Sequence, residues 1–310
     1  MALLPLSSST LIAAKQQWVD TMLIWQQLEV MQLGPSVSLR DEVYSWPVSS
    51  GCRIDQELVY GNWSSAAWLD TMSVNTYGLD AVEHLLFAEL ENDCSASVDI
   101  NTEGTWAALS PEDITASRAA MAIVLARHIR ETGAELLTLW EEDYSRELAT
   151  AASFSSEQEA INSVYAALLY LETSTHEDKL GLPLGEHPDC GSATCPEDIE
   201  HPRSGLSTRS IHANLIGFQT LFTGGSGQGL DDILVAVGEP SLSVTLLSEL
   251  DQVIAATSAL DGPLDQAVID NYDDVMNIFD ELDDVIELLT GHIATVLLLQ
   301  APPPGHEETD

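Results

Sequence analysis

Apolar residues recur every three or four positions along most of this chain, and runs that alternate apolar with polar residues are rare. Such spacing gathers apolar side chains on one face of an α-helix, so it predicts an all-α fold. Gly34-Pro35 and Trp46-Pro47 end predicted helices, because proline forces the residue before it out of the α region. Ser110-Pro111, followed by two acids, starts another. The expected helices cover residues 9–33, 38–46, 79–90, 111–150, 155–172, 204–222, 241–260 and 263–299, with one more after Gly229.

Residues 173–203 interrupt this pattern and are rich in Gly, Pro, His and Asp, which predicts a long loop that is functional or held by a disulfide. The run Gly224-Gly225-Ser226-Gly227 lacks the Lys-Ser/Thr of a phosphate-binding loop, so we interpret it as a turn. Residues 301–304 are expected to begin a tail. Each half of the chain has a long opening helix, a middle helix that carries candidate functional residues, and a long closing helix. This organisation predicts two antiparallel helical bundles related by an internal pseudo-repeat, over residues 1–150 and 151–310.

The predicted helix at 79–90 carries acids where packing alone would place leucine. Leu79, Val82, Leu86 and Leu90 share an apolar stripe, with Leu85 at its edge. Glu83 falls inside this stripe, and Asp80 and His84 lie on its shoulder. A carboxylate on a core-facing stripe is costly unless a cation, a metal or a hydrogen-bond donor meets it. Glu83 is therefore either a functional group or the partner of one buried arginine that fixes the helix register.

A second set of polar residues lies on the apolar stripe of the helix after Pro111. His128 and Glu135 fall on this stripe. A satisfied core histidine is the favoured interpretation of His128. Glu83, His128 and Glu135, projecting from facing helices, would nevertheless be the kind of set that builds a metal site inside a bundle.

Acidic residues dominate the charge: 50 Asp and Glu face 10 Lys and Arg, for a net charge of −40. Such a field repels nucleic acid and anionic membranes, attracts cations and basic partners, and also suits a solvated surface in a saline setting. Nucleic-acid binding is excluded on this ground. No window is long and uncharged enough for a transmembrane helix, and residues 1–10 lack the basic start of a signal peptide. An export signal is therefore either absent or already removed.

The four cysteines favour an oxidising compartment. Four cysteines can pair in three ways, and no C-x-x-C spacing of a zinc site occurs. We predict a local Cys190–Cys195 bridge, and a longer Cys52–Cys94 bridge that ties the segment after Trp46-Pro47 to the loop after residue 90. Such staples favour export to the periplasm or cell surface.

The order of several motifs resembles the imelysin family. The resemblance is carried by the runs Leu39–Pro47, Gly78–Phe87, Asp178–Gly185, Arg203–Ser207, Asn214-Leu215 and Gly229–Leu234, and it spans nearly the whole chain. It implies an all-helical fold of two related bundles, export to the bacterial periplasm or cell surface, and a link to iron uptake. It also implies an old assignment as a metallopeptidase.

Relatives in the iron-uptake branch carry G-x-H-x-x-E, and here Gly78, Asp80 and Glu83 occupy these positions. The histidine is thus replaced by aspartate, and hard oxygen ligands suit Fe(III), Ca²⁺ or Mg²⁺ better than zinc. His84, one turn after Asp80, would restore a nitrogen ligand, but a solvent-facing histidine is the favoured interpretation. We expect a metal ion, with iron ahead of calcium or zinc.

Other members of the common pattern are candidate binding residues. Rare cations such as Arg40 and Lys179 are conspicuous, and either would be explained if it neutralised a buried acid. Arg203 is a candidate partner for a carboxylate in a groove between the halves, whereas capping by Ser204 and bundle packing explain this segment equally well. The candidate binding residues are Gly78, Arg40, Trp46, Lys179, Arg203, Ser204 and Asn214.

Three functions follow from these observations. The leading one is an extracytoplasmic protein of iron acquisition that binds a metal ion or metal complex between the bundles and contacts an uptake partner in the cell envelope. A metallopeptidase with Glu83 as general base is the second, although no H-E-x-x-H zinc motif occurs. The third is an acidic module that binds a basic peptide or partner.

Overall fold

The computed structural model describes residues 7–65 and 67–300, and every element in this part of the chain is helical. The all-α prediction is therefore confirmed. The described residues form two units, one of residues 7–22 and 37–141 and the other of residues 23–36 and 142–300. The predicted tail at 301–304 and the first six residues of the chain lie outside the described residues. The pseudo-repeat and the division at residue 150 stay predictions.

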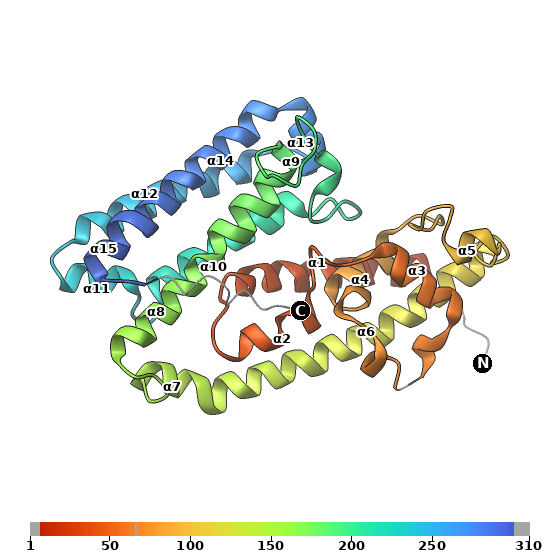
Figure 1. The fold of residues 1–310 in the computed structure, drawn as a ribbon, viewed down its shortest axis with the longest axis horizontal. Helices are drawn as coiled ribbons and strands as arrows, with labels where there is room; N and C mark the ends of the chain where they lie inside the picture. Colours follow the sequence, from red (N-terminus) through yellow and green to blue (C-terminus); the bar gives the residue numbers. More distant parts are fainter. Residues whose placement is uncertain (1–6, 66, 301–310) are drawn as a thin grey trace. The chain divides into compact units, whose positions relative to one another are not determined.

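The first unit holds the beginning of α1 (Ser8–Glu29), most of α2 (Pro35–Val43), and the helices around α4. These helices are α3 (Gly51–Tyr60), η1 (Asn62–Ser64), η2 (Leu69–Thr71), η3 (Val74–Thr76), α4 (Leu79–Phe87), α5 (Asp99–Thr102) and α6 (Pro111–Leu139). The short helix α4 packs on α6 and α3 (Figure 1). It ends at Phe87, so Leu90, which we expected on its apolar stripe, instead lies exposed in the next loop.

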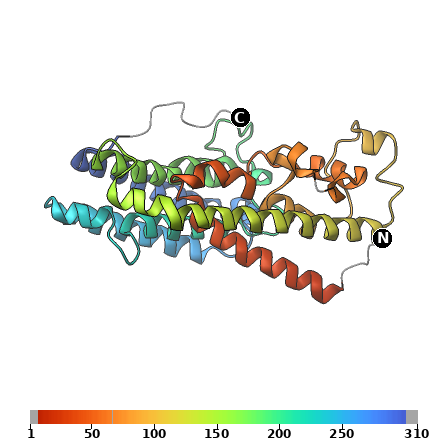
Figure 2. The same ribbon diagram turned by 90° about the horizontal axis from the view of Figure 1, so that it is seen from below.

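Helix ends in this unit follow the local sequence. Ser110 caps α6 by accepting a hydrogen bond from the Asp113 amide at 3.1 Å, as the Ser-Pro start predicts. The helix then continues through a π-helical turn, η4 (Trp140–Tyr144), into α7 (Ser145–Thr150), which belongs to the second unit, and this matches the predicted helix over 111–150 (Figure 2). Helix α3 was not predicted. Its cap is Ser50, whose hydroxyl accepts from the Arg53 amide at 3.2 Å.

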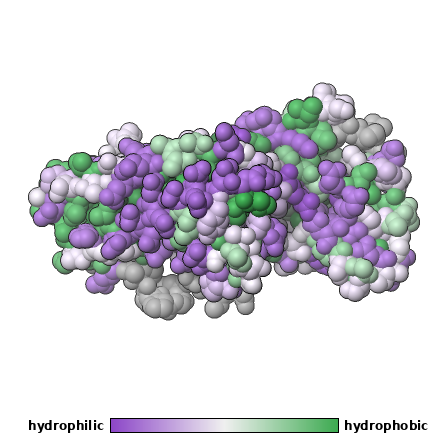
Figure 3. Space-filling model, turned by 90° about the horizontal axis from the view of Figure 1, so that it is seen from above, coloured by the Kyte–Doolittle hydropathy of each residue, from purple (hydrophilic) through white to green (hydrophobic). Residues whose placement is uncertain are grey.

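The second unit packs long helices side by side. It contains α8 (Glu157–Leu168), α10 (Ser207–Thr223), α11 (Leu230–Ala236), α12 (Pro240–Ala259), α13 (Leu264–Asp270), α14 (Tyr272–Glu287), η7 (Leu288–Ile293) and α15 (Ala294–Leu297). Helix α12 lies between α10 and α14 (Figure 1). One core of aliphatic residues and phenylalanine, including Phe218, Leu246 and Leu282, joins them. The acidic side chains of α14 are exposed to solvent. Hydrophilic residues cover much of the molecular face shown in Figure 3.

The predicted loop at 173–203 is only partly a loop. Residues Leu171–Gly181 form a π-helix, η5, which continues into α9 (Leu182–Leu184), so the prediction is wrong for this stretch. The true loop follows and includes η6 (Pro196–Asp198). Both predicted disulfides are confirmed, because Cys190 bonds Cys195 in this loop and Cys52 bonds Cys94 in the first unit.

Candidate functional site

Asp80 lies in the first turn of α4 and is 9% exposed. Gly78 precedes the helix with φ 101°, and a Cβ at this position would lie 2.6 Å from Asp80 Oδ1 and 3.1 Å from the Val43 carbonyl oxygen. Glycine is therefore required here both for its backbone angle and for the space it leaves. The motif glycine thus leaves the space that the Asp80 carboxylate and the backbone at the end of α2 both border.

The two oxygens of Asp80 have different surroundings. Oδ2 lies 2.8 Å from Ser45 Oγ, whose single proton is also within reach of the Val74 carbonyl oxygen at 2.9 Å. Oδ1 makes no hydrogen bond of standard geometry within the described residues. Burial raises the pKa of Asp80 to about 6, although Ser45, Ser49 and the nearby amides of α4 act in the opposite direction. Oδ1 is therefore the less firmly bonded of the two oxygens of this buried carboxylate.

Glu83 lies one turn further along α4 and is only 4% exposed. The prediction that this acid lies on a buried face is confirmed. Asp80 and Glu83 are thus two buried carboxylates at i, i+3 spacing on one helix, where side chains are neighbours. Their role as metal ligands stays a prediction.

His84 is buried and does not face solvent, so the favoured interpretation from the sequence is wrong. Its Nε2 lies 3.0 Å from Asp55 Oδ1, and its Nδ1 lies 3.5 Å from Asp93 Oδ2. Both ring nitrogens face carboxylates, which leaves no lone pair directed toward a metal next to Asp80. The physical reason is that Asp55, the partner of His84, belongs to α3, a helix that was not predicted from the sequence.

The predicted set of Glu83, His128 and Glu135 is not assembled. Glu135 is exposed on α6, and His128 packs edge-on against Tyr77 with 5.3 Å between ring centroids. His128 Nε2 lies 3.5 Å from Glu42 Oε2. Within residues 7–65 and 67–300, no three His, Cys, Asp or Glu side chains converge as metal ligands. Glu135 was placed on the apolar stripe wrongly, because this stripe is buried at Thr132 and half-buried at Leu136, whereas the Glu135 side chain is exposed.

Arg118 is a buried residue of this unit that was not among the candidates predicted from the sequence. Its guanidinium donates to the carbonyl oxygens of Ala88 at 2.9 Å, of Glu91 at 3.2 Å, and of Glu89. One of its nitrogens also lies 3.6 Å from Asp55 Oδ1. Arg118 therefore holds the chain just after the C-terminus of α4, where a positive charge is also favoured by the helix dipole.

A second buried polar cluster lies in the other unit, around Lys179 of η5. Its ammonium lies 2.5 Å from Glu29 Oε2, 2.8 Å from Glu200 Oε1 and 2.6 Å from Gln26 Oε1. Asn214 accepts from the same ammonium at 3.0 Å and donates to the Gln26 carbonyl oxygen at 2.7 Å. The expectation that Lys179 neutralises a buried acid is thus met, and the three partners beyond Asn214 were missed.

This cluster, defined here as the Lys179 network, joins four segments that are far apart in sequence. Lys179, Glu29, Gln26 and Asn214 are 0–1% exposed, and Glu200 is 4% exposed. Each partner of the ammonium is itself hydrogen-bonded, as when Gln26 Nε2 donates to Glu200 Oε1 at 2.8 Å. A buried ammonium with two carboxylates and two amides is a closed arrangement that holds segments together.

The remaining candidate binding residues lie at helix ends. Arg40, on α2, is half-buried with its guanidinium 3.2 Å from Asp41 Oδ1. Trp46 is half-buried in the turn after α2. Arg203 and Ser204 are half-buried in the turn before α10, which begins at Ser207 with Leu206 at its N-cap position. Ser204 therefore does not cap this helix, and binding by these residues stays a prediction.

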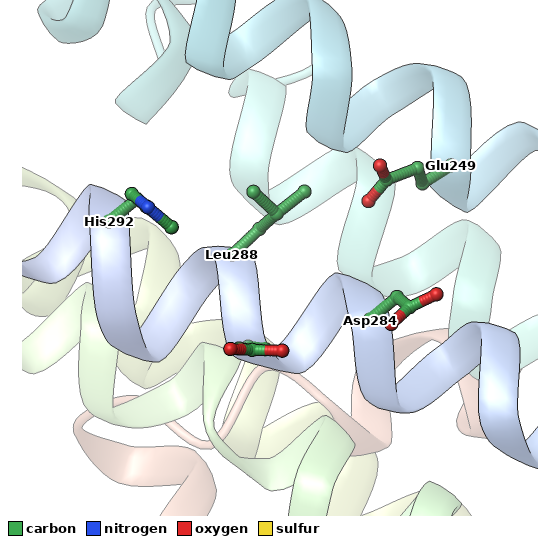
Figure 4. A pocket seen from close by; sticks show the side chains of 5 residues that line it. Glu249, Asp284, Leu288 and His292 are labelled. Carbon is green, nitrogen blue, oxygen red and sulfur yellow. The ribbon is translucent and has the colours of Figure 1, made fainter.

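A hollow on the surface of the second unit lies between α12 and the α14–η7 helix (Figure 4). It has a volume of about 290 Å³ and is lined by Glu249, Asp284, Glu287, Leu288 and His292. Partial burial raises the pKa of Glu249, and the charge of Asp284 adds to this rise. These side chains are not among any group arranged to hold a metal in the described part of the chain.

Asp80→Asn is expected to remove a pH-dependent cost of folding. The pKa of Asp80 rises from 3.8 to about 6 on folding, so the folded protein binds this proton more tightly than the unfolded chain. The cost of ionising Asp80 is therefore absent below pH 4, develops between pH 4 and 6, and reaches about 3 kcal/mol above this window. Urea unfolding at several pH values should show Asp80→Asn gaining on the wild type by 2 to 3 kcal/mol, roughly, from pH 4 to 7. If the difference in unfolding free energy between Asp80→Asn and the wild type did not change with pH, this prediction would be contradicted.

No helix in the described ranges is long and apolar enough to cross a membrane. The imelysin-like protein from Psychrobacter arcticum 273-4 has a similar structure, with a TM-score of 0.62 and 20% identity over 96% of this chain and 85% of that one. A protein described as an iron-regulated protein A precursor, from Parabacteroides distasonis ATCC 8503, also has a similar structure. Its TM-score is 0.68, and the identity is 17% over 94% of this chain and 84% of that one.

At these identities the two solved structures establish the shared fold. None of the curated proteins matches the sequence. The Imelysin family model matches residues 3–290, which is nearly the entire chain. The chain belongs to the imelysin family.

Proposed function

We propose that this protein acts outside the cytoplasm in iron acquisition and binds a metal cation through Asp80 and Glu83 of α4. The observation that carries the proposal is the buried carboxylate pair, in which Asp80 Oδ1 makes no standard hydrogen bond within the described residues. Burying a carboxylate costs free energy unless a cation or a hydrogen-bond donor compensates its charge. A bound cation would compensate the charge of Asp80.

The residues present fit a hard cation in part. Carboxylate oxygens suit Fe(III), Ca²⁺ and Mg²⁺, and Mg²⁺ and Ca²⁺ commonly keep water among their ligands. Because His84 is engaged by Asp55 and Asp93, Asp80 and Glu83 form a pair and not a closed cage. Water or the ligand's own groups would therefore complete the coordination, and the cation would supply positive charge that favours the ionised form of Asp80.

Two further findings support the compartment and the link to iron. Both pairs of cysteines form disulfides, and disulfides persist in oxidising environments outside the cytoplasm. The structure from Parabacteroides distasonis belongs to a protein described as an iron-regulated precursor. Contact with an uptake partner in the cell envelope is a further part of this proposal.

Calorimetric titration tests the cation site. The purified protein at pH 7.5 is titrated with Ca²⁺, with Zn²⁺ and with Fe(III) supplied as a soluble citrate chelate. We expect saturable binding of a hard cation that weakens at least tenfold in the Asp80→Asn, Glu83→Gln variant, because each substitution removes a negative oxygen ligand. Glu131→Gln, Glu135→Gln is the matched control, since it removes the same number of negative charges from two exposed acids of α6.

The titration is repeated at high salt to distinguish direct ligation of the cation from long-range electrostatic attraction. Direct ligation should largely persist in 1 M NaCl, whereas attraction by the overall charge of −40 should be screened. Absence of saturable binding, or equal affinity in the double variant and the wild type, would refute the proposal.

A further inference from the structure

The loop after α4 returns to α3 and is fastened there at two adjacent residues. This loop, residues 88–98, is called the Asp93 loop. Cys94 is bonded to Cys52 in the first turn of α3, with 4.4 Å between their Cα atoms. Next to it, the Asp93 amide donates to Asp55 Oδ2 at 3.0 Å. The disulfide and this hydrogen bond both join the Asp93 loop to α3.

His84 lies between these two elements and belongs to the helix that carries Asp80 and Glu83. Its ring is enclosed by Asp55 of α3 on one side and by Asp93 of the loop on the other, at 3.0 and 3.5 Å. Gly51, next to Cys52, leaves room for this ring, because a Cβ there would collide with the Asp93 carboxylate and lie 2.9 Å from His84 Nδ1. The position of Asp93 beside His84 therefore depends on the position of its neighbour Cys94.

The disulfide adds a covalent restraint to the noncovalent contacts of the Asp93 loop, which include those of Arg118 with the carbonyl oxygens of residues 88, 89 and 91. The Asp93 side chain is 35% exposed, and its 3.5 Å approach to His84 is long for a hydrogen bond. Without the bond, residues 52 and 94, which are 42 positions apart, would have to meet at the full entropic cost of closing that loop. Loss of the bond should therefore loosen the Asp93 loop first and α4 through His84 next.

We infer that the Cys52–Cys94 disulfide is a redox-responsive clamp that sets how firmly α4 is held. A dithiol reductant would form its own disulfide, and its two protons and two electrons would convert Cys52 and Cys94 to thiols. Both cysteines are partly exposed, so a reductant can reach them. The functional consequence rests on the proposed function: the reduced protein binds its cation less tightly at Asp80 and Glu83.

Hydrogen exchange of the full chain, followed by mass spectrometry, tests the clamp without any ligand. We expect amides of residues 79–98 to exchange at least tenfold faster in Cys52→Ala, Cys94→Ala than in the wild type. Wild type treated with dithiothreitol should behave in the same way. Cys190→Ala, Cys195→Ala is the matched control and should leave these amides unchanged, and α14 should be unchanged in all proteins.

Asp93→Asn keeps the disulfide and so addresses the case in which the double variant fails to fold. It should speed exchange in α4 by a smaller factor, because the contact with His84 is weakened while the disulfide remains. Equal exchange of α4 in oxidised and reduced wild type overturns the clamp.

Calorimetry then separates this inference from the proposed function. We expect reduction to weaken cation binding about tenfold, and unchanged affinity alongside faster exchange would overturn the functional half of the inference. If the oxidised protein binds no cation while α4 still responds to reduction, the proposed function fails and the clamp is supported.

Discussion

Lys179→Met is expected to destabilise the protein by about 3 to 5 kcal/mol, because it leaves Glu29 and Glu200 buried without their cation. Methionine fills most of the volume of the lysine stem, so the loss reports charge and hydrogen bonding more than packing. The ammonium has four oxygen acceptors within 3.0 Å, and all of them lose a donor together. Denaturation by urea at pH 7.5, followed by circular dichroism, measures the effect.

The only other lysine provides the control. Lys15 is half-buried, with its ammonium 4.7 Å from the centre of the Phe87 ring, and Lys15→Met should cost about 1 kcal/mol or less. A triple variant, Lys179→Met with Glu29→Gln and Glu200→Gln, should recover much of the loss because no buried charge remains. A triple variant as unstable as Lys179→Met would show that the uncompensated charge is not the cause.

The fold class was predictable because helix signals in this chain are local. The Ser110-Pro111 start and the period of apolar residues after it specify a helix that runs from α6 through η4 to α7. The prediction of a loop over residues 173–184 was wrong for a physical reason. Thr173, Ser174 and Thr175 have weak helix propensity, yet η5 forms because Leu171 and Leu180 are buried in the core of the second unit. Tertiary packing of this kind is not visible in a local window.

The site was predictable to the extent that a single helix reveals it. Glu83 on an apolar stripe indicated a buried acid, and the scarcity of cations indicated that Lys179 meets one. The partners were not predictable, because Glu29 lies 150 positions from Lys179 and Asp55 lies 29 from His84. One available signal was missed. Arg118 is in register with Ile114, Met121 and Leu125, so a guanidinium on that stripe required buried acceptors.

Arg118→Met is the second substitution with a large expected effect, again about 3 to 5 kcal/mol of destabilisation. Asp55 is fully buried and would lose its nearby cation, leaving His84 Nε2 and the Asp93 amide among its partners. The carbonyl oxygens of Ala88, Glu89 and Glu91 would lose their donor at the same time. Because these carbonyls follow α4, its C-terminal end should loosen as well.

Two matched variants identify the origin of this loss. Arg127→Met, exposed on the same helix, removes the same charge and should change the free energy of unfolding by less than about 0.5 kcal/mol. Arg118→Lys keeps a charge near Asp55 but cannot reproduce the planar fork that reaches three carbonyls, so its loss should lie between the other two. Urea unfolding gives all three values. If Arg118→Lys were as stable as the wild type, the carbonyl contacts would contribute nothing, and the charge beside Asp55 would account for the whole effect of Arg118.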